Sequence, residues 1–165
     1  MITNNLFNHI LIDPVQNGSN KLLIVLGYAT SAMAFHHLTE LNNLGRTDIE
    51  IKLIIGMSSA EGISVSNHNG FKQIVNDNGG RFQCSYRTSA PPAHSKMYLW
   101  MANDEPRLSF LGSANYTQTA FNERRQKEIL TECNNRDALA YFESMVNDSI
   151  YCEHPDSENM IQIFN

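Results

Sequence analysis

Short aliphatic runs alternate with helical patterns in the first half of this chain, and the alternation constrains the fold more than any other feature. Lys21 to Gly27 and Ile51 to Met57 are apolar runs with turn signals on both sides, which predicts two buried strands. Between them, Ser31 opens a helical pattern that ends near Gly45, a residue suited to a C-terminal cap. Strands that alternate with helices favour an α/β domain with a mainly parallel sheet.

The rest of the chain extends this pattern. We expect further helices over 69–78, 116–121 and 138–147, and further strands over 81–86, 94–101, 107–111 and 128–133. The two strands that follow the Pro91-Pro92 break are close in sequence, so they are expected to add an antiparallel pair to the sheet. The segment after Tyr151 reads as a C-terminal extension or the start of a linker, which gives one domain over residues 1–150.

The bulk properties fit one domain, alone or as part of a longer protein. The chain has 165 residues, of which 42% are apolar, and the first apolar run is too short to span a bilayer. No stretch resembles a signal peptide, so we expect a cytoplasmic protein without a membrane partner. Cys84, Cys133 and Cys152 have no metal-binding spacing and are odd in number, which favours reduced thiols. Cys84 and Cys133 lie in apolar patterns and are expected in the core.

Two short motifs carry the chemistry. His94 and Lys96 are two residues apart on a predicted strand, so both side chains are expected on the same face. A neutral imidazole can attack phosphorus, and an adjacent ammonium offsets the charge of the phosphate oxygens. Gly112-Ser113-Ala114-Asn115 adds close backbone approach, a hydroxyl and an amide. The structural alternatives are a polar pair on an edge strand and a helix N-cap.

The segment from Ala93 to Glu128 resembles the phospholipase D superfamily, whose signature is H-x-K, usually an Asp, then G-S-x-N and a downstream acid. The run HSKMYLWM…FLGSANYTQTAF is most similar to the nuclease branch, especially restriction endonucleases of the BfiI/NgoFVII type, and GYATSAMAF also resembles that branch. The resemblance implies a phospholipase D-like mixed β-sheet flanked by helices on both faces. Met101 occupies the position of the usual Asp, which weakens a phospholipase assignment more than a nuclease one.

The resemblance also implies a function. We expect a metal-independent endonuclease domain that hydrolyses DNA through a covalent phosphohistidine, with no cofactor and with sequence recognition supplied by a separate domain. The expected catalytic residues are His94, Lys96, Ser113, Asn115 and Glu128. His94 would be the nucleophile, and Lys96 and Asn115 would bind the non-bridging oxygens. A lipid phosphodiesterase and a catalytically idle nucleic-acid-binding domain are the alternative functions.

Two features of the predicted mechanism stay open. Glu128 is the candidate carboxylate that orients a histidine, and Glu123 is the alternative. Only one H-x-K motif is present, whereas the two-step chemistry of the superfamily needs a second histidine as general acid. We therefore expect a homodimer with the active site on its two-fold axis, which brings two copies of His94 together.

The net charge of −5 is unusual for a protein that binds DNA, so local charge has to supply the affinity. Arg81, Arg87 and Lys127 lie near the motifs in sequence. The expected substrate-binding residues are Tyr28, Ser31, Arg124 and Arg125. The structural alternatives are core packing for Tyr28, helix capping for Ser31 and a solvated surface for Arg124 and Arg125.

The remaining histidines predict no metal site. His36 and His37 are adjacent on the first long helix, without a further ligand one turn away, and are expected on its solvated face. His9, His68 and His154 form no recognisable constellation.

Overall fold

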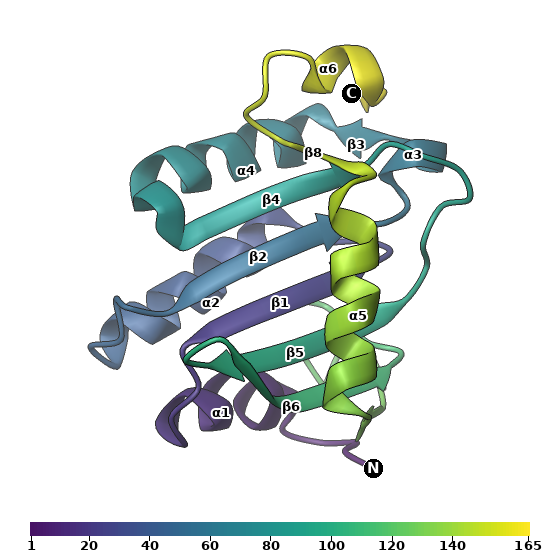
Figure 1. Ribbon diagram of the computed structural model, residues 1–165. Helices are drawn as coiled ribbons and strands as arrows, with labels where there is room; N and C mark the ends of the chain where they lie inside the picture. The colour runs from purple at the N-terminus through teal and green to yellow at the C-terminus, as the bar shows by residue number, and fades with distance from the viewer.

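The computed structural model describes residues 1–165, and its centre is a seven-stranded mixed sheet (Figure 1). The strand order is β7-β6-β5-β1-β2-β4-β8. The central strands β1, β2 and β4 are parallel to one another. Strand β5 is antiparallel to β1, β6 to β5, β7 to β6, and β8 to β4. The strands are β1 (Lys21–Leu26), β2 (Glu50–Ile55), β4 (Phe82–Arg87), β5 (Lys96–Ala102), β6 (Glu105–Gly112), β7 (Leu130–Glu132) and β8 (Ser149–Tyr151). The parallel centre and the antiparallel motif strands agree with the expectation from the sequence.

Three long helices cover the sheet, and a polar side chain caps the first turn of each. They are α2 (Ser31–Asn43), α4 (Val65–Asn78) and α5 (Asn135–Val146). Thr30, Ser64 and Asn134 accept hydrogen bonds from backbone N–H groups at the three N-termini. The short helices are η1 (Phe7–Ile12, a π-helix), α1 (Asp13–Gln16), α3 (Ser58–Glu61), η2 (Gly79–Arg81, a 3₁₀ helix) and α6 (Ser157–Met160).

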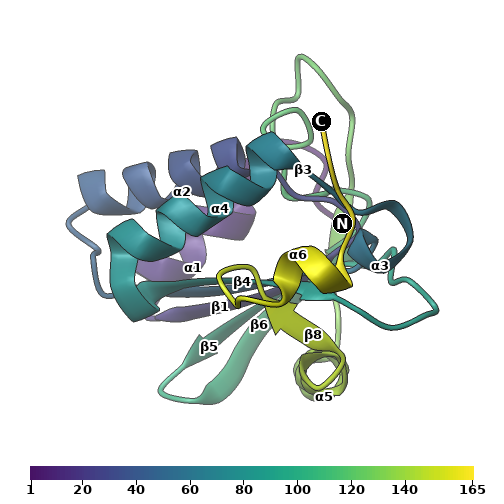
Figure 2. The ribbon, with the colours of Figure 1, turned by 90° about the horizontal axis from the view of Figure 1, so that it is seen from above.

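Helices pack on both faces of the sheet, as the resemblance implied. Figure 2 shows α1, α2 and α4 on one side and α5 on the other. The strand period of two divides β1 between these layers: Leu22, Ile24 and Leu26 join the core beneath α2 and α4, whereas Leu23 and Val25 face α5. No helix is long and apolar enough to cross a membrane.

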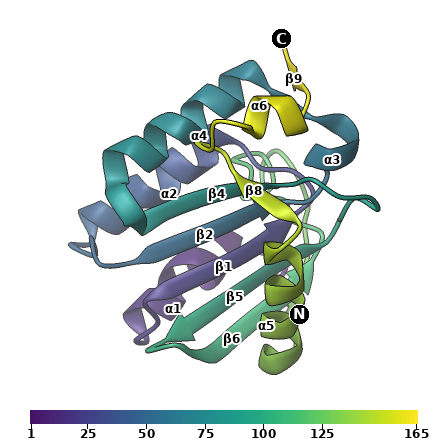
Figure 3. The ribbon, with the colours of Figure 1, turned by 45° about the horizontal axis from the view of Figure 1, so that its top comes forward.

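The C-terminal segment folds back onto the domain. Figure 3 shows it passing from β8 towards α4, where α6 lies. Cys152 and Ile161 are buried, and strand β9 (Ile163–Phe164) pairs in parallel with β3 (Ile63–Ser64). Residues 151–165 are thus packed against the preceding residues, in contrast to the extension or linker suggested by their polar composition.

Several predicted elements differ from the structure. No helix forms over 116–121: Tyr116 pairs with Ala29 in an isolated bridge and accepts a hydrogen bond from the backbone N–H of Thr30, and turns follow. Helix α4 begins at Val65, earlier than predicted, because Ser64 caps it. Strand β5 begins at Lys96, two residues after its predicted start.

His37 corrects the expectation of a solvated histidine pair. Its side chain is fully buried, with Nδ1 2.7 Å from the Tyr116 hydroxyl and Nε2 3.2 Å from the Leu11 carbonyl oxygen. Only His36, its neighbour, remains partly exposed. The apolar stripe of α2 includes the His37 position because two polar groups from distant segments satisfy the ring there.

His68 also belongs to a buried polar group, although the sequence indicated none. Its Nδ1 lies 2.8 Å from the Tyr86 hydroxyl, and its Nε2 lies 3.0 Å from the Glu158 carboxylate. These contacts join α4 to β4 and to α6. Of the two cysteines expected in the core, Cys84 is buried and Cys133 is partly buried.

Candidate active site

The two motifs meet at one edge of the sheet because of the strand directions. Strand β1 ends at Leu26, which pairs with Lys96 at the start of the antiparallel β5. Strand β6 then runs back, so that Leu111, near its end, pairs with Met97. The end of β1, the start of β5 and the end of β6 therefore lie side by side. His94 directly precedes β5 and Asn115 follows β6, so the two motifs meet there.

His94 and Lys96 are in direct contact. The Lys96 Nζ atom lies 3.1 Å from both ring nitrogens of His94 and donates to the His94 carbonyl oxygen at 3.0 Å. His94 is exposed, whereas Lys96 is half-buried. Burial lowers the pKa of Lys96, and the nearby charge of Glu128 opposes that shift. The pair combines an imidazole open to solvent with a less solvated cation.

Two glycines make room for the segment that carries His94. A Cβ atom on Gly27, directly after β1, would lie 2.7 Å from His94 Cδ2. A Cβ atom on Gly56, directly after β2, would lie 2.1 Å from the Ala93 carbonyl oxygen. Gly56 thus allows the close approach of the Ala93 backbone, and Gly27 leaves room for the His94 ring.

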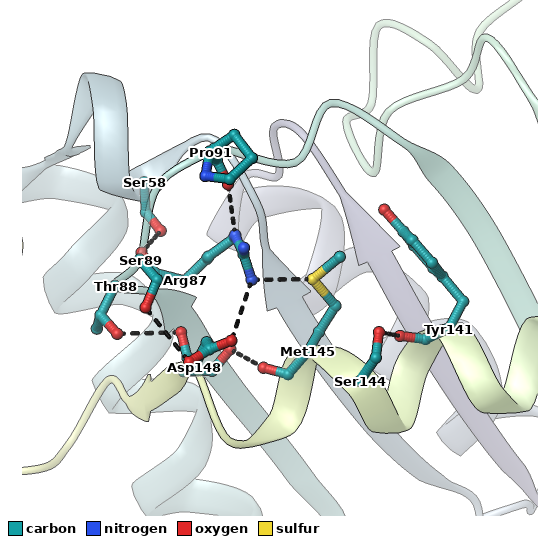
Figure 4. A network of polar contacts seen from close by, with 10 residues as sticks. Ser58, Arg87, Thr88, Ser89, Pro91, Tyr141, Ser144, Met145 and Asp148 are labelled. Carbon is teal, nitrogen blue, oxygen red and sulfur yellow. Dashed lines mark hydrogen bonds and ion pairs between the residues drawn. The ribbon is translucent and has the colours of Figure 1, made fainter.

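The loop before His94 is tied to α5 through Arg87 and Asp148 (Figure 4). Arg87 Nε donates to the Pro91 carbonyl oxygen at 2.8 Å, and Arg87 Nη1 lies 3.2 Å from Met145 Sδ and 4.0 Å from Asp148 Oδ2. The Thr88 hydroxyl donates to the Asp148 carbonyl oxygen at 3.0 Å. Arg87 thus orders this loop.

Two of the arginines expected to add positive charge near the motifs, Arg81 and Arg87, are bonded within the fold instead. Arg81 donates to the carbonyl oxygens of Ile49 and Arg46 at 2.9 Å, which occupies it in the fold as well. Arg81 and Arg87 therefore hold the fold together, in contrast to the expectation that they add basic charge around the motifs. Arginines are often recruited in this way because one guanidinium can satisfy several carbonyl oxygens.

Ser113 and Glu128 form the second side of the candidate site. The Ser113 hydroxyl donates to Glu128 Oε2 and accepts from the Ile129 backbone N–H at 3.0 Å. Gln126 donates to the other oxygen of the nearly buried Glu128 carboxylate. Glu123, the alternative acid, instead accepts from the backbone N–H of Asn5. The structure thus brings Glu128, and not Glu123, to the Ser113 motif.

Asn115 and Tyr28 connect this motif to the end of β1. The Tyr28 backbone N–H donates to Asn115 Oδ1 at 3.1 Å, which leaves the Asn115 amide NH₂ available as a donor. The rings of Tyr28 and His94 meet edge to face, with centroids 5.7 Å apart and an interplanar angle of 79°. The Tyr28 hydroxyl donates to Glu61 at 2.7 Å. Tyr28 thus contacts residues from both motifs.

No hydrogen bond or ion pair joins the other predicted substrate-binding residues to His94. The Ser31 backbone N–H and hydroxyl donate to Asn67 Oδ1 at 3.0 and 3.3 Å, which joins α2 to α4. Arg124 and Arg125 are exposed in the turns between Asn115 and Glu128, and neither forms an ion pair. Both guanidinium groups are therefore free to meet a polyanion.

Three residues near the motifs carried no signal in the sequence. They are Glu61, which accepts from Tyr28, Gln126, which donates to Glu128, and Tyr141 of α5, whose hydroxyl donates to Ser95 Oγ at 3.0 Å. Glu61 and Tyr141 are 33 and 46 positions from their partners, so no local spacing could identify them.

Comparisons with solved structures show where this fold recurs. Nuc from Salmonella typhimurium, described as a phospholipase D family member, is 14% identical, with a TM-score of 0.60 over 87% of this chain and 89% of Nuc. NucT from Helicobacter pylori is 15% identical, with a TM-score of 0.53 over 91% of this chain and 96% of NucT. Phosphatidylserine synthase from Haemophilus influenzae is 16% identical, with a TM-score of 0.56 over 92% of this chain but 38% of the synthase. At these identities the likeness concerns the fold.

Sequence comparison adds the family. No curated protein matches the chain. A family profile described as the NgoFVII restriction endonuclease N-terminal PLD domain matches residues 4–159. The match covers nearly the whole chain, including both motifs and residues 151–159. The chain therefore belongs to the NgoFVII restriction endonuclease N-terminal PLD domain family.

Proposed function

We propose that this chain is a nuclease domain of the phospholipase D superfamily that hydrolyses DNA phosphodiester bonds without a metal ion, as the catalytic part of a restriction endonuclease. The observation that carries the proposal is the contact of the Lys96 ammonium with both ring nitrogens of His94, 3.1 Å away. Membership of a restriction endonuclease family supports DNA as the substrate. The likeness to Nuc and NucT is consistent with the same reaction class.

The proposed reaction has two steps. A ring nitrogen of His94 attacks phosphorus, an N–P bond forms, and the bond from phosphorus to the 3′ oxygen breaks. Lys96 and the Asn115 amide stabilise the charge on the non-bridging oxygens, and Ser113 assists through its hydroxyl. Water then attacks phosphorus, the N–P bond breaks, and a 5′-phosphate is released. Glu128 is proposed to act by positioning Ser113 and by supporting the charge of Lys96.

A homodimer completes this mechanism. One His94 cannot both attack phosphorus and protonate the leaving oxygen in the same step, and the chain has a single H-x-K motif. We propose that His94 of a second copy donates that proton and later accepts one from the attacking water. Because His94 is exposed at the edge of the sheet, a two-fold axis can pass beside it.

Arg124 and Arg125 are proposed to contact the DNA backbone. They are exposed and unpaired, and they follow Asn115 by nine and ten positions. Phosphate contacts of this kind supply affinity without sequence preference. The recognition of a specific DNA sequence is therefore assigned to a separate domain.

The test is cleavage of plasmid DNA in the presence of EDTA. We expect cleavage by the unaltered protein to persist and cleavage by His94→Ala to disappear, while thermal unfolding confirms that the variant is folded. An oligonucleotide labelled at its 3′ end and trapped on His94 in an alkaline denaturing quench would identify the intermediate, because the downstream fragment keeps the scissile phosphate and the N–P bond is stable in alkali. Complete inhibition by the chelator would overturn the metal-independent mechanism. Faster hydrolysis of phosphatidylcholine vesicles than of DNA would favour a lipid phosphodiesterase, and DNA binding without turnover would favour an idle domain.

A further inference from the structure

A small pocket opens beside the candidate nucleophile. Its volume is about 200 Å³, and it is lined by the ends of β1 and β2, by α3 and the start of α4, and by β9. Gly27 and Tyr28 belong to this lining, and both also contact His94. A phosphate held at His94 would therefore have one of its flanking nucleosides at the mouth of the pocket.

Apolar side chains form about half of the pocket lining. Met57 and Ile63 supply aliphatic surface, and the rings of Tyr28 and Phe164 are 38% and 43% exposed. Aromatic side chains of this exposure, next to a candidate phosphodiesterase centre, are suited to stacking against a base.

Two polar groups in the pocket have unused hydrogen-bonding capacity. Glu61 accepts from the Tyr28 hydroxyl through Oε2, and its Oε1 has no partner within the protein. Asn67 accepts from the Ser31 backbone N–H, which can only donate, so the Asn67 oxygen faces Ser31. The Asn67 NH₂ group consequently remains available as a donor. The pocket lining thus includes one free acceptor, Glu61 Oε1, and one free donor, the Asn67 NH₂ group.

We propose that this pocket binds one unstacked nucleobase of the substrate, adjacent to the cleaved phosphate. The proposal rests on the proposed nuclease function. A carboxylate acceptor beside an amide donor matches guanine best, because guanine presents adjacent N–H donors and a carbonyl acceptor on one edge. The base must leave its stack to enter, which costs least in a single strand.

The C-terminal segment completes the pocket. Phe164 reaches it because β9 pairs with β3, with Ile163 opposite Ile63 and Phe164 opposite Ser64. The contact between His68 and Glu158 holds the preceding turn against α4. Phe164 therefore offers a second variant that alters the pocket without changing Glu61.

The experiment measures base preference with single-stranded oligonucleotides of random sequence, whose cleavage positions are mapped by sequencing. The unaltered protein is expected to favour guanine at one position next to the cut, by about tenfold over thymine. Glu61→Gln keeps an acceptor for the Tyr28 hydroxyl but adds a donor, so this ratio is expected to fall towards one. Phe164→Ala is expected to lower the cleavage rate of guanine-containing oligonucleotides relative to oligonucleotides with an abasic site at that position.

Glu105→Gln is the matched control, because Glu105 is exposed at the start of β6, at the opposite end of that strand from Ser113. Its preference profile is expected to equal that of the unaltered protein. A flat profile for the unaltered protein, or a guanine preference that survives both pocket variants, overturns the pocket proposal while leaving the nuclease proposal intact. Failure to cut single-stranded oligonucleotides while plasmid DNA is still cleaved also overturns the pocket proposal, whereas failure to cut either substrate overturns the nuclease proposal itself.

Discussion

At the scale of single residues, two opposing effects act on the pKa of Lys96. Partial burial lowers its pKa because the charged form loses solvation, and the negative charge of Glu128 raises it. Glu128 is itself held by Ser113 and Gln126. The proposed reaction needs both the ammonium form of Lys96 and a protonated His94 of the second copy, so the carboxylate of Glu128 influences the alkaline limit through Lys96.

Glu128→Gln tests this dependence. Loss of the negative charge is expected to lower the pKa of Lys96 further, so activity is lost at a lower pH on the alkaline side of the profile. The measurement is kcat/KM for DNA cleavage as a function of pH. Glu123→Gln is the control, since Glu123 contacts Asn5. An unchanged alkaline limit in Glu128→Gln, or an equal shift in the control, would contradict the prediction.

At the scale of elements, His37 joins three segments that are distant in sequence. It lies on α2, its Nε2 donates to the Leu11 carbonyl oxygen of η1, and its Nδ1 accepts from Tyr116 after the Asn115 motif. This arrangement requires the neutral ring. Burial lowers the pKa of His37 to about 4, only partly opposed by the Leu11 carbonyl.

The free energy of unfolding is therefore expected to decrease at acidic pH. Between the unfolded pKa of about 6.5 and the folded pKa of about 4, the unfolded chain binds the proton that folded His37 does not. The free energy of unfolding should fall as the pH drops through this window, by at most about 1.4 kcal/mol per pH unit from this residue. Urea unfolding at several pH values measures the slope.

His37→Gln separates this contribution from that of other groups. The variant is expected to be less stable at neutral pH by about 1–3 kcal/mol, because a buried hydrogen-bonded ring is lost, and to show a shallower pH slope. His9→Gln is the control, since His9 is exposed. A slope in His37→Gln as steep as in the unaltered protein would refute the assignment. His68, whose pKa burial also lowers, accounts for part of any slope that remains.

At the scale of the whole molecule, the candidate site lies open at the edge of the sheet. Helices cover both faces of the sheet (Figure 2). His94 and Ser113, beside the ends of their strands, are exposed. The homodimer proposed above would place a second copy beside these exposed residues. The proposed general acid would come from that copy.

Subunit mixing provides the test. If each site needs two His94 residues, mixing the unaltered protein with His94→Ala by co-expression should reduce activity as the square of the unaltered fraction. A monomeric enzyme would lose activity in direct proportion to that fraction. Light scattering of the same samples gives the mass. A monomer that cleaves DNA, with linear loss on mixing, would exclude the shared site.

The predictions that succeeded were those that depend on local patterns. The apolar runs of β1 and β2 and the intervening α2 follow from residue periodicity, which needs no knowledge of the rest of the chain. The helix expected over 116–121 was wrong because Tyr116 pairs with Ala29 across the fold. The solvated position expected for His37 was wrong because its partners lie on two other segments.

By itself, the sequence determined the α/β layering, the two motifs and the resemblance to a phospholipase D-type family, because strand and helix periods and motif spacings are local properties. Only the tertiary structure decided that Glu128 lies beside Ser113 while Glu123 lies beside Asn5, since both acids follow the motif in sequence. It alone placed Phe164 in a pocket beside Tyr28. The physical reason is that strand directions and backbone pairing bring distant residues together, and these contacts leave no trace in local spacing.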